Sequence, residues 1–257
     1  MLGKIIGIGN TAEVYEWGED QALKLFKSGY PLDAVEKEFG NAVAVENCDF
    51  DKPRVYSRMD YEGRYGILYE RLDGTTLLDW VLKTRELETC ADILAREHKR
   101  ILHNKAAGVR KHKDILLWNI KNTHELPEAI REKVMEILHG LPDGDMLCHG
   151  DFHPGNIILH EGRRVVIDMM NICGGHKYSD IARSVYLIEM TPVPEGIGNP
   201  EELMKLKKYL TDCYISKIGL TRDDINQWLI VIAAARLNEN CNPTEINTII
   251  HFLNNSL

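Results

Sequence analysis

The chain has 257 residues, 44% of them hydrophobic, a net charge of −8 at pH 7, and six cysteines that form no CxxC pair. This negative charge disfavours nucleic acid as a partner and weakly favours a cationic one, because phosphate groups bind to basic surfaces. Since the longest apolar run, residues 228–235, is too short to cross a bilayer and the N-terminus lacks a signal-peptide layout, we expect a cytoplasmic protein with reduced thiols that binds no membrane.

The first predicted element is a glycine-containing turn between two strands near the N-terminus. Gly7 and Gly9 allow the backbone to approach phosphate groups closely, and Asn10 and Thr11 complete the turn. Ala12 stands where protein kinases have a third glycine. The pattern therefore leaves two interpretations open, a phosphate-binding loop or an ordinary hairpin turn.

A lysine and two glutamates follow in the order that a kinase requires. Lys24 lies inside an apolar strand segment, residues 22–26, where it is either an edge-strand charge or a ligand for nucleotide phosphates. The segment 32–45 has helical spacing and carries Glu36 and Glu38. We expect one of these glutamates to pair with Lys24 and the other to be a solvated surface charge.

The next segments predict the division of the chain into two lobes. Residues 64–74 have the composition of a strand that ends in a connector, so we assign an N-terminal lobe to residues 1–70 and a C-terminal lobe to residues 71–257. Helical patterns follow between residues 75 and 117 and again beyond Asp180. The order predicts an α+β fold in which the N-terminal lobe is β-rich and the C-terminal lobe is mainly helical.

The stretch from residue 146 to residue 168 carries two acids and an amide at the spacing used in phosphoryl transfer. Asn156 follows Asp151 by five residues, and Asp168 comes twelve residues later, after a turn that reverses the chain. In protein kinases the first Asp accepts a hydroxyl proton, while the Asn and the second Asp bind magnesium. We therefore predict Asp151 as the catalytic base and Asn156 and Asp168 as Mg²⁺ ligands, with His149 bracing the loop.

The chain resembles the aminoglycoside phosphotransferase and choline kinase family, a group of small-molecule kinases with a protein-kinase-like two-lobe fold. The resemblance rests on HGDxxxxN at residues 149–156, on IDxxN at residues 167–171, and on the run YSDIA at residues 178–182. The HGD triplet distinguishes this pattern from the HRD of protein kinases, and no Ala-Pro-Glu segment follows. A protein kinase is therefore disfavoured.

The resemblance implies roles for residues of the N-terminal lobe and the connector. Glu38 would be the ion-pairing glutamate, and the backbone of Glu70 and Leu72 would bind the adenine. Tyr69 occupies the gatekeeper position, where a bulky tyrosine in some relatives favours guanine, so both ATP and GTP stay open as donors. Met169 and the residue after it depart from the family pattern, which puts the geometry near the second metal ligand in doubt.

The resemblance also suggests the phosphate acceptor. Because the family recruits acids from its last helices to bind substrate, Glu239 is the candidate substrate residue. The expected acceptor is an aminoglycoside or a similar aminated compound with a hydroxyl group. The alternatives are a choline, ethanolamine or sugar kinase of the same fold, or a nucleotide-binding regulator without catalysis.

Overall fold

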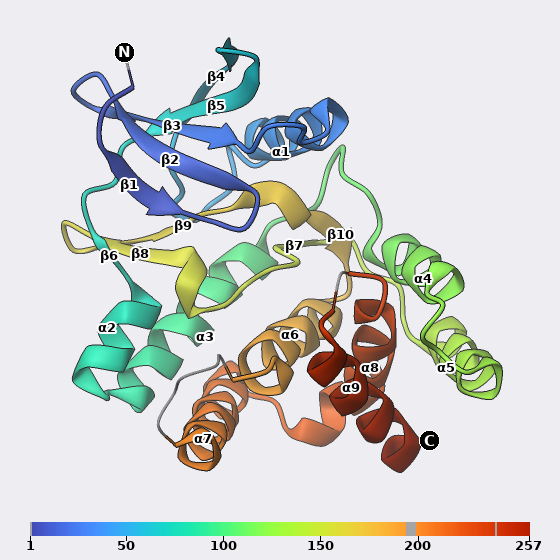
Figure 1. Cartoon of the computed structure of the whole chain (residues 1–257). Coiled ribbons are helices and arrows are strands. Elements are labelled where there is room, and N and C mark those ends of the chain that lie inside the picture. Colours follow the sequence, from blue (N-terminus) through green and yellow to red (C-terminus); the bar gives the residue numbers. More distant parts are fainter. Residues whose placement is uncertain (1, 194–198, 240) are drawn as a thin grey trace.

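The N-terminal part of the computed structural model is an antiparallel sheet with a helix against it, and the C-terminal part is mainly helical (Figure 1). The structure describes residues 2–193, 199–239 and 241–257. The predicted α+β, two-lobe fold is therefore confirmed. Strand β5 ends at Glu70.

The N-terminal sheet positions Lys24. Its strands are β1 (Ile5–Ile8), β2 (Ala12–Trp17), β3 (Gln21–Phe26), β4 (Val55–Tyr61) and β5 (Arg64–Glu70), in the spatial order β1-β2-β3-β5-β4. Leu23 and Leu25 of β3 are buried on one face of the sheet. Phe26 packs on the other face, which helix α1 (Leu32–Ala44) covers. Because side chains alternate along a strand, Lys24 shares the face of Phe26 and points towards α1.

Helices build most of the C-terminal lobe. They are α2 (Leu77–Thr84), α3 (Leu87–His103), α4 (His112–Asn122), α5 (Glu128–Gly140), α6 (Lys177–Val185), α7 (Pro200–Ile218), α8 (Arg222–Arg236) and α9 (Pro243–Ser256). Helix α8 is buried on all sides from Trp228 to Ala235, which is why this part of its sequence is a continuous apolar run without helical periodicity. None of the described helices is long and apolar enough to cross a membrane.

Short antiparallel ladders hold two polar loops between the lobes. Strand β7 (Met146–Cys148) pairs with β10 (Cys173–Gly175), and β6 (Thr75–Thr76), β8 (Ile157–His160) and β9 (Arg163–Val166) lie in the order β6-β8-β9. The HGD loop (residues 149–156) leaves β7, and the Asp168 loop (residues 167–172) enters β10. The pairing of β7 with β10 therefore places the two loops side by side.

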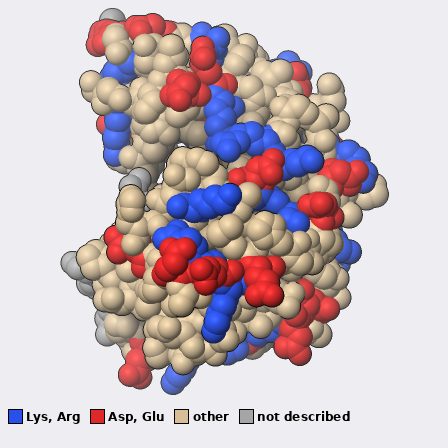
Figure 2. All heavy atoms as spheres, turned by 90° about the vertical axis from the view of Figure 1, so that its right-hand side faces the viewer, with Lys and Arg blue, Asp and Glu red and all other residues tan. Residues whose placement is uncertain are grey.

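The surface facing the viewer in Figure 2 carries both signs of charge. Lysine and arginine side chains lie there beside aspartate and glutamate side chains.

Candidate active site

A cavity of about 720 Å³ lies between the lobes, a volume typical of small-molecule sites. All but one of the residues predicted for catalysis, metal binding, nucleotide binding or substrate binding line it. These residues are Gly7, Gly9, Asn10, Thr11, Lys24, Glu38, Glu70, Leu72, Asp151, Asn156 and Asp168. Glu239 is not among the residues that line this cavity.

The glycine segment forms the β1–β2 turn at the edge of the cavity. The Gly9 N–H donates to the carbonyl of Ala12 at 2.8 Å, which closes a tight hairpin turn. Asn10 and Thr11 lie at the tip of this turn and also line the cavity. The two interpretations of the sequence are therefore compatible, since the segment is a hairpin turn whose backbone faces the space between the lobes.

Lys24 connects the N-terminal lobe to the Asp168 loop. Its Nζ lies 2.6 Å from Glu38 Oε1 and 3.4 Å from Asp168 Oδ1. Glu36, the other glutamate in this part of α1, pairs instead with Arg58 at the surface. The structure thus distinguishes the two candidates, because only Glu38 lies on the side of α1 that faces β3.

Burial and opposing charges set the pKa values of these groups. Burial lowers the pKa of Lys24, but the carboxylates of Asp168 and Glu38 outweigh this effect and raise it above its ordinary value. Burial raises the pKa of Asp168, but the charge of Lys24, its hydrogen bond to Asp168 and further effects of His149 and Met170 together outweigh burial and lower the pKa. At Glu38 burial dominates and the pKa is raised. Lys24 and Asp168 are therefore charged at neutral pH.

Asn156 is oriented by Asp151. Its Nδ2 donates to the backbone carbonyl of Asp151 at 2.8 Å and to Asp151 Oδ2 at 3.1 Å. Because the amide nitrogen is engaged in this way, the amide oxygen Oδ1 is the atom left to bind a cation. Oxygen atoms from Asn156 and Asp168 form the kind of ligand set that magnesium prefers.

Asp180 holds the backbone of the HGD loop. Its carboxylate accepts from the N–H groups of His149 at 2.6 Å and Gly150 at 2.8 Å, and it contacts His98 Nε2 at 2.9 Å. Although burial raises the pKa of Asp180, the hydrogen bond to His98 holds it well below its ordinary value. Asp180 belongs to the YSDIA run that was noted in the sequence. The sequence did not indicate that its carboxylate would bind the backbone of the HGD loop.

His149 braces the loop, as expected from the sequence. Its Nδ1 accepts from the Asp151 N–H at 3.3 Å, so Nε2 carries the proton and donates to the Ile167 carbonyl at 3.1 Å. Burial lowers the pKa of His149, which favours this neutral form. The ring therefore joins the HGD loop to the Asp168 loop.

Asn41 is a site residue that the sequence analysis missed. Its Nδ2 donates to the carbonyls of Met169 at 2.9 Å and Met170 at 3.1 Å, which ties α1 to the Asp168 loop. Asn41 follows Glu38 by three residues, so both side chains lie on one face of the helix. That spacing was the signal in the sequence that could have identified it.

The connector after β5 lines the cavity through Glu70 and Leu72. Leu72 is half-buried, and its N–H has no hydrogen-bond partner among the described residues. An unpaired backbone N–H beside a cavity is available to a ligand acceptor. Tyr69 lines the same cavity, and its hydroxyl donates to Glu38 Oε1 at 3.3 Å. The Tyr69 side chain is thereby held towards α1.

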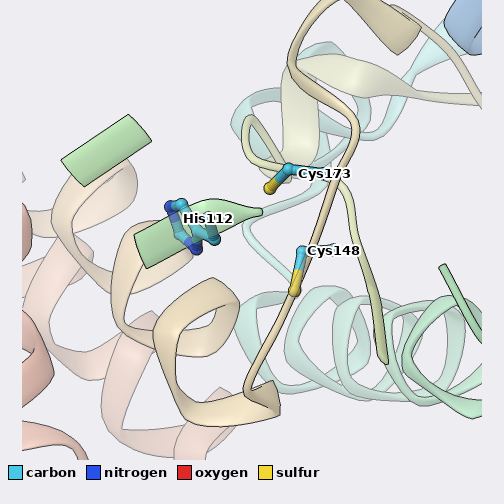
Figure 3. A group of neighbouring side chains, drawn as sticks. All are labelled: His112, Cys148 and Cys173. Atoms are coloured by element: carbon cyan, nitrogen blue, oxygen red, sulfur yellow. The ribbon is translucent and has the colours of Figure 1, made fainter. Parts of the chain in front are cut away.

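A second group of polar side chains lies behind the HGD loop. His112, Cys148 and Cys173 are buried together, with their potential ligand atoms within 4.8 Å of one another (Figure 3). Ser179 Oγ donates to the His176 carbonyl at 2.7 Å, so His112 Nδ1 is the donor in its 2.8 Å bond to Ser179. All three side chains are buried, and both cysteines belong to the hydrophobic core.

Glu239 lies against two arginines. Its carboxylate contacts Arg183 Nη2 at 2.6 Å and Arg236 Nη1 at 2.9 Å. Burial raises the pKa of Glu239, but the charges and hydrogen bonds of Arg183 and Arg236 together outweigh burial and lower the pKa, so the carboxylate is ionised at neutral pH. The Arg183 Nε also donates to the Gly150 carbonyl in the HGD loop at 3.2 Å.

Comparison with known proteins shows which family the chain is similar to. The model of the phosphotransferase enzyme family matches residues 3–199. No curated protein sequence matches the chain. Among solved structures, the ternary complex of aminoglycoside phosphotransferase APH(4)-Ia with AMP-PNP and hygromycin B has a TM-score of 0.68 and 13% identity, over 99% of this chain and 91% of that chain.

Further solved structures share the fold. The ternary complex of APH(2")-IIa with streptomycin and ATP has a TM-score of 0.65 and 15% identity, and the match covers 99% of this chain and 91% of that one. Amicoumacin kinase hAmiN in complex with AMP-PNP, Ca²⁺ and Ami has a TM-score of 0.61 and 14% identity, and the match covers 98% of this chain and 87% of that chain. At such identities the likeness concerns the fold alone.

Proposed function

Since the chain belongs to the phosphotransferase enzyme family, we propose that it is a magnesium-dependent kinase that transfers the γ-phosphate of ATP or GTP to a hydroxyl group of a small molecule. The observation that carries this proposal is the convergence of Lys24, Asp151, Asn156 and Asp168 on one cavity. A regulator that had lost catalysis would be expected to lack one of these four side chains.

Nucleotide binding is assigned to the N-terminal side of the cavity. The backbone of Glu70 and Leu72 would bind the base, and Lys24 and the turn from Gly7 to Thr11 would contact the phosphates. The unpaired N–H of Leu72 supports this assignment. The structural neighbours include complexes with ATP, ADP and AMP-PNP, which favours an adenine nucleotide, and Tyr69 keeps GTP as an alternative.

Asn156 and Asp168 would hold Mg²⁺, because both line the same cavity and the Asn156 amide nitrogen is already engaged by Asp151, which leaves its oxygen for a cation. When bound, the cation supplies charge neutralisation for the phosphates. Asp151 would orient the acceptor hydroxyl and accept its proton, while Asn156 holds the Asp151 carboxylate in place through the 3.1 Å hydrogen bond. Asp168 would retain its negative charge at neutral pH because of Lys24.

For the acceptor we propose an aminoglycoside or a similar aminated compound. The structural neighbours include complexes with hygromycin B, streptomycin and gentamicin, and the net charge of −8 favours a cationic partner. Choline, ethanolamine and sugars are the alternatives within the same chemistry. The described cysteines are free thiols, which supports the proposal of a cytoplasmic location.

The test is nucleotide consumption by the purified protein with Mg²⁺ and either ATP or GTP, against aminoglycosides, choline, ethanolamine and sugars. We expect one acceptor class to stimulate turnover. Replacing Asp151→Asn should reduce that turnover about a hundredfold or more, since a general base contributes at least that factor. Nucleotide affinity should stay unchanged. Turnover of the Asp151→Asn protein within a few-fold of the original would refute the role of Asp151.

A further inference from the structure

Helix α6 holds the HGD loop at two points with opposite charges. Asp180 accepts the N–H of Gly150 at 2.8 Å, and Arg183, one turn later on the same face of α6, donates to the carbonyl of Gly150 at 3.2 Å. Gly150 has a φ of 75°, in the left-handed region. Both polar groups of this residue are thus fixed from one helix.

The carbonyl of Gly150 belongs to the same planar peptide unit as the nitrogen of Asp151. A hydrogen bond to that carbonyl therefore restricts rotation of the peptide plane from which the Asp151 side chain projects. Asp180 restrains the preceding peptide plane in the same way. Together these contacts restrain the backbone from which the Asp151 side chain projects.

Arg183 is a buried cation that needs a counterion. Its side chain is 8% exposed, and it makes a two-point contact with Glu239, with Nη1–Oε1 at 3.2 Å and Nη2–Oε2 at 2.6 Å. A buried charge without a partner is costly, and a planar guanidinium matches a carboxylate at two points. Glu239 therefore allows Arg183 to remain charged beside the HGD loop.

Glu239 is in turn held by the connection between α8 and α9. Arg236 at the end of α8 donates to Glu239 at 2.9 Å and to Glu245 of α9 at 2.9 Å. The hydroxyl of Tyr186 also donates to Glu245, at 2.8 Å. The hydrogen bonds therefore run without interruption from the start of α9 to the backbone beside Asp151.

We propose that Arg183 is a positioning residue for Asp151 and that Glu239 serves as its counterion, an inference that rests on the proposed phosphotransfer function. In this role Glu239 acts through Arg183 and not by binding an amino group of the acceptor directly. The C-terminal helices would then influence the rate of phosphoryl transfer through the geometry of the HGD loop.

The experiment compares the double variant Arg183→Met/Glu239→Gln with a matched control. Replacing both residues avoids leaving one charge buried and unpaired. The control is Arg222→Met, because Arg222 also makes a two-point contact with a glutamate, Glu189, away from the HGD loop. Both proteins are examined by amide hydrogen exchange of residues 149–152 and by Mg²⁺-dependent hydrolysis of ATP or GTP without acceptor.

In the double variant we expect the loop amides to exchange roughly tenfold faster, since local opening becomes easier. We expect kcat for nucleotide hydrolysis to fall about tenfold or more, because a misplacement of about 1 Å can cost that factor. The dissociation constant of the nucleotide should stay within about twofold, since the nucleotide contacts assigned above lie elsewhere. The control should exchange and hydrolyse like the original protein.

Loop exchange in the double variant equal to that of the control would overturn the proposal. So would a single Glu239→Gln variant whose loop exchange is unchanged, because that result would assign Glu239 to ligand binding. Absence of nucleotide hydrolysis in the original protein would instead count against the proposed phosphotransfer function. The exchange measurement would still decide whether Arg183 and Glu239 hold the loop.

Discussion

At the scale of single residues, the active site depends on backbone conformations that few side chains tolerate. Gly150 has a φ of 75°, and Asp168 has a φ of 66° although it is not a glycine. Left-handed backbone costs a residue with a Cβ about 1 kcal/mol or more. At Asp168 the surrounding contacts offset this cost, since Lys24 holds its carboxylate and Asn41 holds the next two carbonyls.

We predict that Gly150→Ala destabilises the protein much more than Gly162→Ala. Both positions have positive φ, so each alanine costs about 1 kcal/mol. At Gly150 the added Cβ would also lie 2.3 Å from the carbonyl oxygen of Asn171, whereas at Gly162 nothing lies within 4 Å. The clash should add about 1–3 kcal/mol. Urea unfolding of both variants measures the difference, and equal losses would contradict the prediction.

His112 should make stability depend on pH. Burial lowers its pKa from 6.5 to about 4, so the unfolded chain takes up a proton at a higher pH than the folded chain. Stability is therefore full above pH 6.5 and falls as the pH drops towards 4. A single group of this kind contributes about 1.4 kcal/mol per pH unit, or about 2 kcal/mol between pH 6.5 and 5.

The corresponding test compares His112→Gln with the original protein by urea unfolding at pH 7.5 and pH 5. The variant should lose about 2 kcal/mol less of its free energy of unfolding on acidification, because glutamine does not titrate. His139→Gln, on the exposed side of α5, is the control and should keep the original pH dependence. An unaltered pH dependence in His112→Gln would show that His112 is not responsible.

At the scale of elements, the residue spacings of strand β3 and helix α1 place their polar side chains on the faces where the two elements meet. Every second residue of β3 faces α1, and Glu38 and Asn41 share the face of α1 that meets β3 and the Asp168 loop. Glu38 is 1% exposed, and its second oxygen, Oε2, has no hydrogen-bond partner among the described residues. The ion pair with Lys24 therefore offsets most of the energetic cost of burying the Glu38 carboxylate.

We predict that Lys24→Met lowers the free energy of unfolding by about 3 kcal/mol, because it leaves Glu38 buried without its cation. Adding Glu38→Gln to this variant should recover at least about 1 kcal/mol. Lys27→Met, at an exposed position directly after β3, is the control and should change little. Urea unfolding gives these values, and a double variant no more stable than Lys24→Met would contradict the explanation.

At the scale of the whole molecule, the cavity couples the two lobes because both of them line it. A ligand that filled this space would lie between Lys24 of the sheet and Asn156 and Asp168 of the helical lobe, which all line it. Binding to the folded state alone raises its stability by RT ln(1 + [L]/Kd). Nucleotide binding is therefore expected to stabilise the entire chain and not one lobe only.

We predict that ATP or GTP with Mg²⁺ raises the melting temperature, by an amount equivalent to about 2.7 kcal/mol at a hundredfold excess over Kd. Removing the cation with EDTA should abolish most of this shift, and Asp168→Asn should do the same in the presence of Mg²⁺, because both remove cation-mediated phosphate binding. Thermal unfolding followed by circular dichroism provides the measurement. An equal shift with and without Mg²⁺ would refute the metal dependence.

The patterns that could be recognised from the sequence are local ones. Alternation in the segment around Lys24, the apolar strands on either side of Asp151 and the turn before the Asp168 loop each extend over a few residues. Neighbouring residues determine such structure directly, through strand periodicity and turn chemistry. For this reason the sequence predicted an α+β fold, while the HGDxxxxN and IDxxN motifs carried the resemblance to the family.

The partners of charged side chains could be decided only by the tertiary structure. Glu36 and Glu38 have the same chemistry on one helix, and only packing against β3 distinguishes them. The carboxylate of Glu239 could bind an amino group, yet in the structure it pairs with Arg183, which lies 56 residues earlier in the chain. Ion pairs between distant segments leave no periodicity in the sequence, because folding brings their two halves together independently of spacing.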